Sequence, residues 1–201
     1  VSFVSFNSLE GLRLRAGGKT NAKLHPNWFF SGYGAYGFKD EEFKYNLTTM
    51  YSFEKKKQNP WEYPINMLKV SYEYDVKIPG QAFLYGTGDK LFLSFIRGDI
   101  DKINYERNFE LSWNKEYKSG FTVNPSFNWK RFYPQMTLKY EDGLGNTFNH
   151  LTTSEFGMFL KFAPNERFFQ IQMNRYPLNQ TEPIIELGHK LGIADFLGGQ
   201  Y

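Results

Sequence analysis

The residues best suited to chemistry in this sequence are its three histidines, His25, His150 and His189. They stand far apart, and none falls in a spacing such as H-E-x-x-H, which places two histidines on one helix face to bind zinc. Ser154, close to His150, is the only local candidate for a hydrolase nucleophile paired with a histidine. Nothing in the sequence activates it, so we keep a hydrolase as an alternative and expect structural or solvent-facing histidines.

Two loop motifs resemble ligand sites only loosely. Asp99, Asp101 and Asn104 surround a turn whose oxygen atoms are of the kind that calcium prefers. The turn lacks the spacing and the glycine of an EF-hand, so a polar turn held by side-chain to backbone hydrogen bonds is the favoured interpretation. The glycine-rich stretch 86–90 lacks the spacing of a phosphate-binding loop, and no helical pattern follows it. We predict neither a metal nor a cofactor.

Three glutamates, Glu106, Glu110 and Glu116, are separated by even numbers of residues. In a strand they would share one face, since side chains alternate between the two faces. Paired carboxylates can exchange a proton in an enzyme. In a barrel they would instead line the lumen and pair with basic side chains of neighbouring strands, which is the interpretation we favour.

Composition excludes several classes of protein. The chain has no cysteine, which excludes a disulfide framework, a thiolate nucleophile and a cysteine-based zinc site. Its net charge of +3 gives no basic footprint for nucleic acid. Aromatic residues make up 19% of a chain whose mean hydropathy is -0.56. Many aromatic residues in a polar background suit strands with one apolar and one wet face.

A period of two dominates the sequence. Between Tyr105 and Tyr117, five of the seven odd positions are apolar or aromatic, and none of the six even positions is. A helix would mix these classes, because its period is 3.6 residues. We therefore predict an all-β, antiparallel up-and-down fold. About ten strands are expected, near residues 9–24, 29–39, 43–54, 67–77, 90–97, 104–117, 121–132, 153–163, 167–174 and 183–193. Gly32, Gly34 and Gly37 would let neighbouring aromatic rings lie flat.

Strand length favours a membrane barrel. Several predicted strands run ten to fourteen residues, close to the 9–11 residues of a tilted membrane crossing plus an overhang. Tyr105 and Tyr117 would lie about 30 Å apart along the membrane normal, the spacing of two aromatic girdles. No segment approaches the length of a membrane helix. The predicted lipid-facing or girdle aromatics are Tyr51, Phe53, Tyr72, Tyr74, Tyr105, Phe109, Trp113, Tyr117 and Trp129, and the predicted lumen-facing polar residues are Glu73, Glu106, Glu110, Glu116 and Lys130.

A soluble ligand-binding barrel shows the same alternation with the two faces exchanged. Its apolar side chains point inward, whereas those of a membrane barrel point outward. The period alone does not separate the two. The long strands, the aromatics near strand ends and the many Asn, Ser, Thr and Gly residues on the wet face favour the membrane version.

Several stretches resemble one protein family. They are residues 6–15, 34–45, 97–102 with 105–120, and 161–170 with 176–179. They are similar to the uncharacterised outer-membrane β-barrel family of Bacteroidota whose members usually carry a carboxypeptidase-regulatory-like domain ahead of a barrel, in an architecture like that of TonB-dependent receptors. The resemblance implies an outer-membrane location, a β-barrel and no established enzyme activity. It supplies no functional residues.

These observations lead to one expected function. We expect a non-enzymatic barrel segment over residues 1–201, located in the outer membrane of a Gram-negative cell. It would contact outer-membrane lipid and other envelope proteins, but not nucleic acid, and would serve transport, export or assembly. Because Val1 already resembles a strand residue and the last residues do not resemble a closing strand, we expect a fragment of a longer chain. A soluble ligand-binding barrel and an outer-membrane hydrolase are the alternatives.

Overall fold

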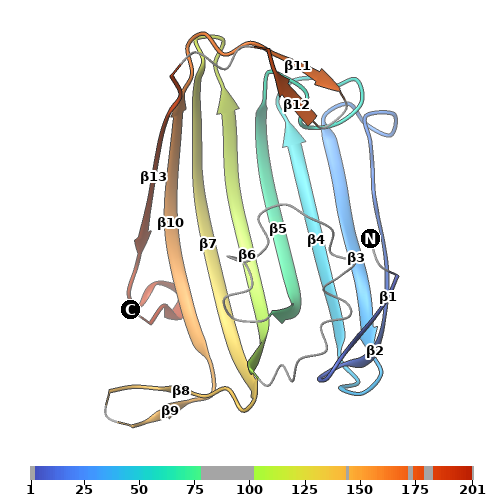
Figure 1. Ribbon diagram of the computed structural model, residues 1–201, viewed down its shortest axis with the longest axis vertical. Coiled ribbons are helices and arrows are strands. Elements are labelled where there is room, and N and C mark those ends of the chain that lie inside the picture. The colour runs from blue at the N-terminus through green and yellow to red at the C-terminus, as the bar shows by residue number, and fades with distance from the viewer. Residues whose placement is uncertain (1–2, 78–101, 144, 172–173, 179–182, 201) are drawn as a thin grey trace.

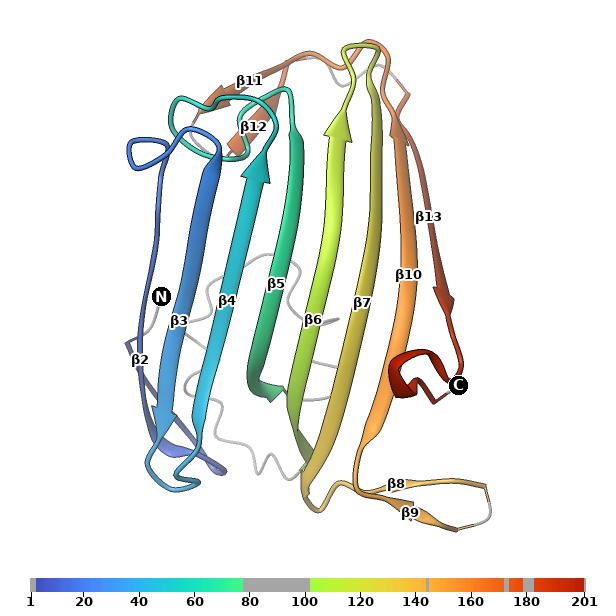
Figure 2. The same cartoon turned by 180° about the vertical axis from the view of Figure 1, so that it is seen from behind.

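Alternating side chains fold this chain into one broad antiparallel sheet. The computed structural model describes residues 3–77, 102–143, 145–171, 174–178 and 183–200. Its main sheet has nine strands in the order β1-β2-β3-β4-β5-β6-β7-β10-β13, and every neighbouring pair is antiparallel. Figures 1 and 2 show these strands side by side as a single wall. The all-β, up-and-down prediction is confirmed at this level.

The strands of the wall are long. They are β1 (Val4–Asn7), β2 (Gly11–Lys19), β3 (Trp28–Gly37), β4 (Phe43–Ser52), β5 (Asn66–Lys77), β6 (Lys102–Glu116), β7 (Phe121–Met136), β10 (Leu151–Phe162) and β13 (Ile185–Gly192). Two small hairpins, β8 (Tyr140–Glu141) with β9 (Thr147–Phe148) and β11 (Phe168–Ile171) with β12 (Asn174–Pro177), lie in connections, and a short 3-10 turn, η3 (Phe196–Gly198), follows β13.

The structure differs from the predicted strands in two places. The stretch 9–24 holds only β2, which pairs with the separate β1, and Gly11 begins β2 with a φ of +63°, a conformation that glycine adopts without strain. The stretch 167–174 is broken, and its residues contribute to the β11–β12 hairpin outside the wall. The predicted strand 90–97 lies outside the described residues.

The connections divide between two ends of the wall, which we call rim A and rim B. Rim A carries residues 20–27, 53–65, 117–120, 163–171, 174–178 and 183–184, and the β11–β12 hairpin lies there, at the top of Figure 1. Rim B carries residues 8–10, 38–42, 137–143 and 145–150, with the β8–β9 hairpin at the bottom of the same view.

Strand register sorts the side chains into two faces. Arg13 pairs with Gly37, and Glu73 pairs with Asn46 on one side and Asn108 on the other, so these positions share a polar face. Leu47 pairs with both Gly32 and Tyr72 on the opposite, apolar face. The apolar face continues across the remaining strands with Phe109, Trp129, Phe127 and Phe156.

The wall bends toward its polar face. Arg13 in β2 and Asp75 in β5 are three strands apart, which in a flat sheet separates the Cα atoms by about 14 Å and holds the side chains parallel to one another. In this protein Arg13 donates from its guanidinium to Asp75 at 2.9 Å. Such a contact requires the strands to curve around these side chains. The polar face is therefore concave and the apolar face convex.

Polar side chains on the concave face are buried, whereas apolar side chains on the convex face are exposed. Lys44, Ser52 and Asp75 on the concave face are buried, with 0%, 0% and 6% of their surface exposed. Leu47 and Leu187 on the convex face are each 63% exposed. Other exposed convex side chains are Leu12, Leu14, Leu68, Val70, Leu111, Phe156, Met158 and Leu191. A water-soluble domain rarely exposes an apolar patch larger than a few hundred Å². Among the described residues, no helix has the length and apolarity needed to cross a membrane.

Gly34 makes room for an aromatic ring on the convex face. A Cβ at Gly34 would lie 2.8 Å from Cζ of Phe43, which occupies the next strand. The ring thus lies over the bare backbone of β3, as the glycine-rich sequence predicted for the neighbouring aromatics. At Gly18, a convex-face glycine in β2, an added Cβ would meet nothing within 4 Å.

We expect Gly34→Ala to lower the free energy of unfolding by about 1 kcal/mol or less, because the methyl group displaces the Phe43 ring, which is exposed and can move aside. The matched change Gly18→Ala should cost little or nothing. Urea unfolding of the detergent-solubilised chain measures both. Equal effects from the two substitutions would contradict the packing of Phe43 over Gly34.

Candidate functional site

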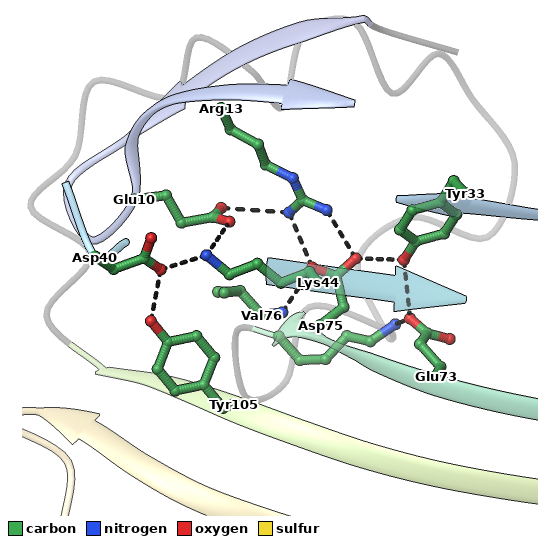
Figure 3. A network of polar contacts seen from close by, with 10 residues as sticks. Glu10, Arg13, Tyr33, Asp40, Lys44, Glu73, Asp75, Val76 and Tyr105 are labelled. Carbon is green, nitrogen blue, oxygen red and sulfur yellow. Dashed lines mark hydrogen bonds and ion pairs between the residues drawn. The ribbon is translucent and has the colours of Figure 1, made fainter. Parts of the chain in front are cut away.

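A chain of paired charges lies near rim B, mainly on the concave face, and extends from the turn after β1 to β6. Its members are Glu10, Arg13, Tyr33, Asp40, Lys44, Glu73, Asp75, Lys77 and Tyr105. Figure 3 shows these side chains meeting from several strands and from the turns beside them. We call this set the rim B cluster.

Arg13 and Asp75 form the centre of the rim B cluster. Arg13 contacts both oxygens of Asp75 at 2.9 Å, and its Nη1 also lies 3.3 Å from Glu10. Two further donors reach Asp75, the hydroxyl of Tyr33 and the backbone N–H of Val76 at 2.7 Å. A carboxylate with two oxygens held by a guanidinium is a strong, geometrically specific pair. The pair ties β2 to β5 across the curve of the wall.

Lys44 extends the cluster to the β3–β4 turn. Its ammonium lies 3.0 Å from Glu10 Oε1 and also donates to Asp40. Tyr105 in β6 donates from its hydroxyl to the same Asp40 carboxylate at 2.5 Å. Lys44 is fully buried, and its charge is matched by two carboxylates that lie at 0% and 7% side-chain exposure.

Asp40 lies in the turn between β3 and β4, and the groups that donate hydrogen bonds to its carboxylate favour the ionised form. Partial burial raises the pKa of its carboxyl, but the hydrogen bonds from Lys44 and Tyr105 and the charge of Lys44 outweigh burial, so the pKa lies below its usual value. The sign of the shift means that Asp40 contributes stability above its unfolded pKa and loses that contribution as the pH falls through its folded pKa.

The rim B cluster is a series of matched ion pairs. Acidic and basic groups alternate along it, and each of its carboxylates contacts a cation of the cluster. A general acid or base needs a proton-transfer partner other than a saturated ion pair. Among the described residues, no three His, Asp or Glu side chains gather in a way that could hold a metal ion.

A second part of the concave face carries small amide and hydroxyl side chains on β6 and β7, such as Ser112, which pairs with Ser126. We call these side chains the β6–β7 polar ladder. Charged side chains such as Glu110 lie among them. The Oδ1 atoms of Asn108 and Asn114 are buried and accept no hydrogen bond within the described part of the chain.

The structure places all five predicted lumen-facing residues on the concave face by register. Glu73 belongs to the rim B cluster, and Glu110 pairs with Lys69 at 2.8 Å. Glu116 forms two bonds, of 2.5 and 2.8 Å, with Arg175 of the β11–β12 hairpin. Glu106 and Lys130 lie in neighbouring rows of the same face.

The predicted girdle aromatics lie on or at the ends of the convex face. Near rim A, Tyr51 packs against Trp28 at 4.9 Å and Phe53 at 5.2 Å, and Tyr117 packs against Phe121 at 6.2 Å. Trp113 lies one row further in, and Phe53 and Tyr117 are 53% and 41% exposed.

A second set of rings lies toward rim B. Tyr45 contacts Tyr72 and Tyr74 at 6.0 and 6.1 Å, and Tyr74 stacks on Tyr105 at 5.7 Å. Tyr105 is only 8% exposed, because its hydroxyl reaches the rim B cluster. Phe109 and Trp129 lie between the two sets on the convex face.

The alternative catalytic residues are engaged elsewhere. Ser154 donates its hydroxyl to the carbonyl of Phe196 at 2.6 Å, and His150 lies against the ring of Tyr133 at 6.0 Å. His25 Nδ1 accepts from the backbone of Asn27 and Trp28 at 3.1 and 3.0 Å, in a structural turn. His189 lies on the convex face beside Met158.

Of the proposed calcium turn, Asp99 and Asp101 lie outside the described residues. Asn104 accepts a hydrogen bond from the hydroxyl of Tyr140 at 2.9 Å.

The sequence did not single out Arg13, Tyr33, Lys44 or Asp75 as partners. Their odd or even position in each strand places them on the polar, concave face. Sequence spacing does not show, however, which residues pair across three strands. Only the curvature of the wall brings them together. Alternation could have identified the face, and the presence of both charge signs on it is the only further signal.

We expect Lys44→Met to lower the free energy of unfolding by about 3–5 kcal/mol, because it leaves two buried carboxylates without their cation. Lys69→Met, which breaks a pair that is 27% exposed on both sides, should cost about 1 kcal/mol or less. Denaturant unfolding compares the two. Similar losses would show that the rim B cluster does not brace the wall.

We expect Asp40→Asn to reduce stability above about pH 4, where the wild-type carboxyl is ionised in both states. The difference in the free energy of unfolding between the variant and wild type should shrink as the pH falls through the folded pKa of Asp40, because the carboxyl is then protonated in both the folded and the unfolded state. Unfolding midpoints between pH 2.5 and 7 measure this. Glu41→Gln, an exposed change in the same turn, is the control and should show no such trend.

Comparison with protein-family models, with curated proteins and with solved structures found no match to this chain. The family resemblance drawn from its turn sequences therefore stays a prediction. Interpretation of function rests on the geometry of the two faces, on the rim B cluster and on the β6–β7 polar ladder.

Proposed function

We propose that this chain forms part of the wall of an outer-membrane β-barrel, with its convex face toward lipid and its concave face toward a polar lumen. It would act without enzymatic activity as a transport, export or assembly component of the cell envelope. The single observation that carries this proposal is the direction of curvature, because the wall bends around its charged side chains and exposes its aliphatic ones.

The aromatic rings support a lipid-facing convex side. Exposed rings gather toward both rims, while Leu47, Val70 and Leu111 occupy the middle. Membrane barrels place an apolar band about 25 Å tall between two aromatic girdles. Strands β5, β6, β7 and β10, with 12, 15, 16 and 12 residues, are long enough for a tilted crossing.

A soluble ligand-binding barrel is a weaker explanation. Its ligand cavity would be apolar and would lie on the concave face, whereas the concave face of this wall holds Arg13, Lys44 and Asp75. Its outer surface would be polar, whereas Leu47 and Leu187 are exposed on the convex face. A hydrolase is weaker still, since Ser154 donates to a backbone carbonyl.

A barrel requires strands that pair with β1 and β13, the two ends of the strand order. Backbone N–H and C=O groups at a sheet edge are costly in lipid, by several kcal/mol for each unsatisfied group. In β13 all eight residues are exposed. The proposal thus implies additional strands, and the resemblance to the Bacteroidota barrel family suggests a larger barrel within an envelope complex.

The polar lumen suits hydrophilic solutes. Its charges are largely matched within the rim B cluster and in the Lys69–Glu110 and Arg175–Glu116 pairs. Between them lies the β6–β7 polar ladder. A solute in the lumen would meet paired charges and neutral hydrogen-bonding groups rather than a field of one sign.

We expect the two faces to differ in their reactivity toward a charged, water-soluble thiol reagent. Because the chain has no cysteine, Leu47→Cys and Asn46→Cys each provide a single label. In water Leu47→Cys should react faster, since Leu47 is exposed and Asn46 is half-buried. In a bilayer the order should reverse, because lipid covers position 47.

The control is the same pair of variants after denaturation, where both should react fully. Rapid labelling of Leu47→Cys in membranes would refute the proposal. Recovery of the chain from a cell lysate in soluble form without detergent would refute it as well.

A further inference from the structure

The two rims of the wall carry opposite charge. In the described connections of rim A, basic side chains outnumber acidic ones. The basic residues are Lys23, Lys55, Lys56, Lys57, Lys118, Arg167 and Arg175, and the acidic ones are Glu54, Glu62 and Glu166.

Rim B has the reverse balance. Its described connections carry the basic residues Lys39 and Lys139 and the acidic residues Glu10, Asp40, Glu41, Glu42, Glu141 and Asp142. The overall charge of +3 conceals this separation. The charges become segregated only because the strand order sends alternate connections to opposite ends.

One of the three acidic side chains of rim A, Glu62, is occupied by internal hydrogen bonds. Glu62 accepts from the backbone N–H groups of Lys57, Gln58 and Asn59, at 2.8, 2.6 and 3.2 Å, and so closes its own loop. Lys56 is buried and donates to two carbonyls in that loop. Lys23, Lys55, Lys57 and Lys118 remain exposed. The outer surface of rim A is therefore basic.

An aromatic belt adjoins these lysines. Lys115, on the convex face of β6, has its ammonium 5.9 Å from the ring of Trp113 and 5.1 Å from that of Tyr117. Lys118 follows in the next turn. Trp28 and Phe53, 41% and 53% exposed, extend the belt over β3 and β4. Apolar rings with cations just beyond them match the boundary between acyl chains and headgroups.

We infer that rim A binds the phosphate groups of anionic lipid headgroups and so fixes the orientation of the wall in its membrane. The inference rests on the proposed function, and it adds a lipid class and a site. Charge complementarity selects the anionic headgroup. The lysines adjoin the exposed rings and the apolar convex face. This arrangement favours a lipid over a free anion, because a free anion would not contact the rings.

The test uses the full chain and vesicles of phosphatidylcholine, with or without phosphatidylglycerol. Wild type should bind more tightly when phosphatidylglycerol is present. The double variant K55Q/K118Q should lose this preference by roughly 25-fold, since each surface lysine near an anionic membrane accounts for roughly a fivefold change in partition. The matched variant K39Q/K139Q removes the same charge from rim B and should keep the preference.

Each outcome decides the inference. Equal losses in the two double variants, or no preference in wild type, would overturn it while leaving the proposed function intact. Failure of wild type to enter either kind of vesicle would overturn both. Replacing chloride by inorganic phosphate at equal ionic strength should not change the preference. If phosphate abolishes it, rim A binds free phosphate and the assignment to lipid is wrong.

Discussion

The contact between Arg13 and Asp75 is the constraint on which the arrangement of this wall depends. Two side chains three strands apart meet at 2.9 Å only when the intervening strands curve around them. Once the direction of curvature is set, every other side chain is assigned by parity. Most charged, amide and hydroxyl side chains face inward, and most leucines and aromatic rings face outward. Arg107, whose guanidinium lies over the ring of Tyr74, is an exception on the outward face. Burial of Lys44 at 0% and exposure of Leu47 at 63% are consequences of that one geometry.

The inverted burial requires an unusual balance of energies. Apolar surface left in water costs about 25 cal/mol per Å², so an extended convex face of leucines and rings is unfavourable for an isolated domain. In lipid that cost disappears, while the requirement for paired backbone groups becomes stricter. Long antiparallel strands meet that requirement along the wall.

Alternation in the sequence predicted most of the wall, because parity in a strand is a local property. It located β3 to β7, β10 and β13 and placed Glu73, Glu110 and Trp113 on their faces. It did not locate the break at Gly11 or the β11–β12 hairpin, since those depend on turn geometry and on the docking of Gln170 to Trp61 and Tyr63. Nor could parity reveal which face is concave, because that follows from contacts between distant strands.

The ion pairs of the rim B cluster specify the register more than they add stability. A buried ion pair recovers little more than the cost of removing its charges from water, so its net contribution is small. A slip of one residue, however, would exchange the faces of a strand. It would turn Leu14 toward the concave side and Arg13 toward the convex side, and leave Asp75 without its cation. A wrong register would therefore leave a buried charge unpaired at a large cost in free energy. The cluster thus selects the one arrangement that keeps the concave face polar and the convex face apolar.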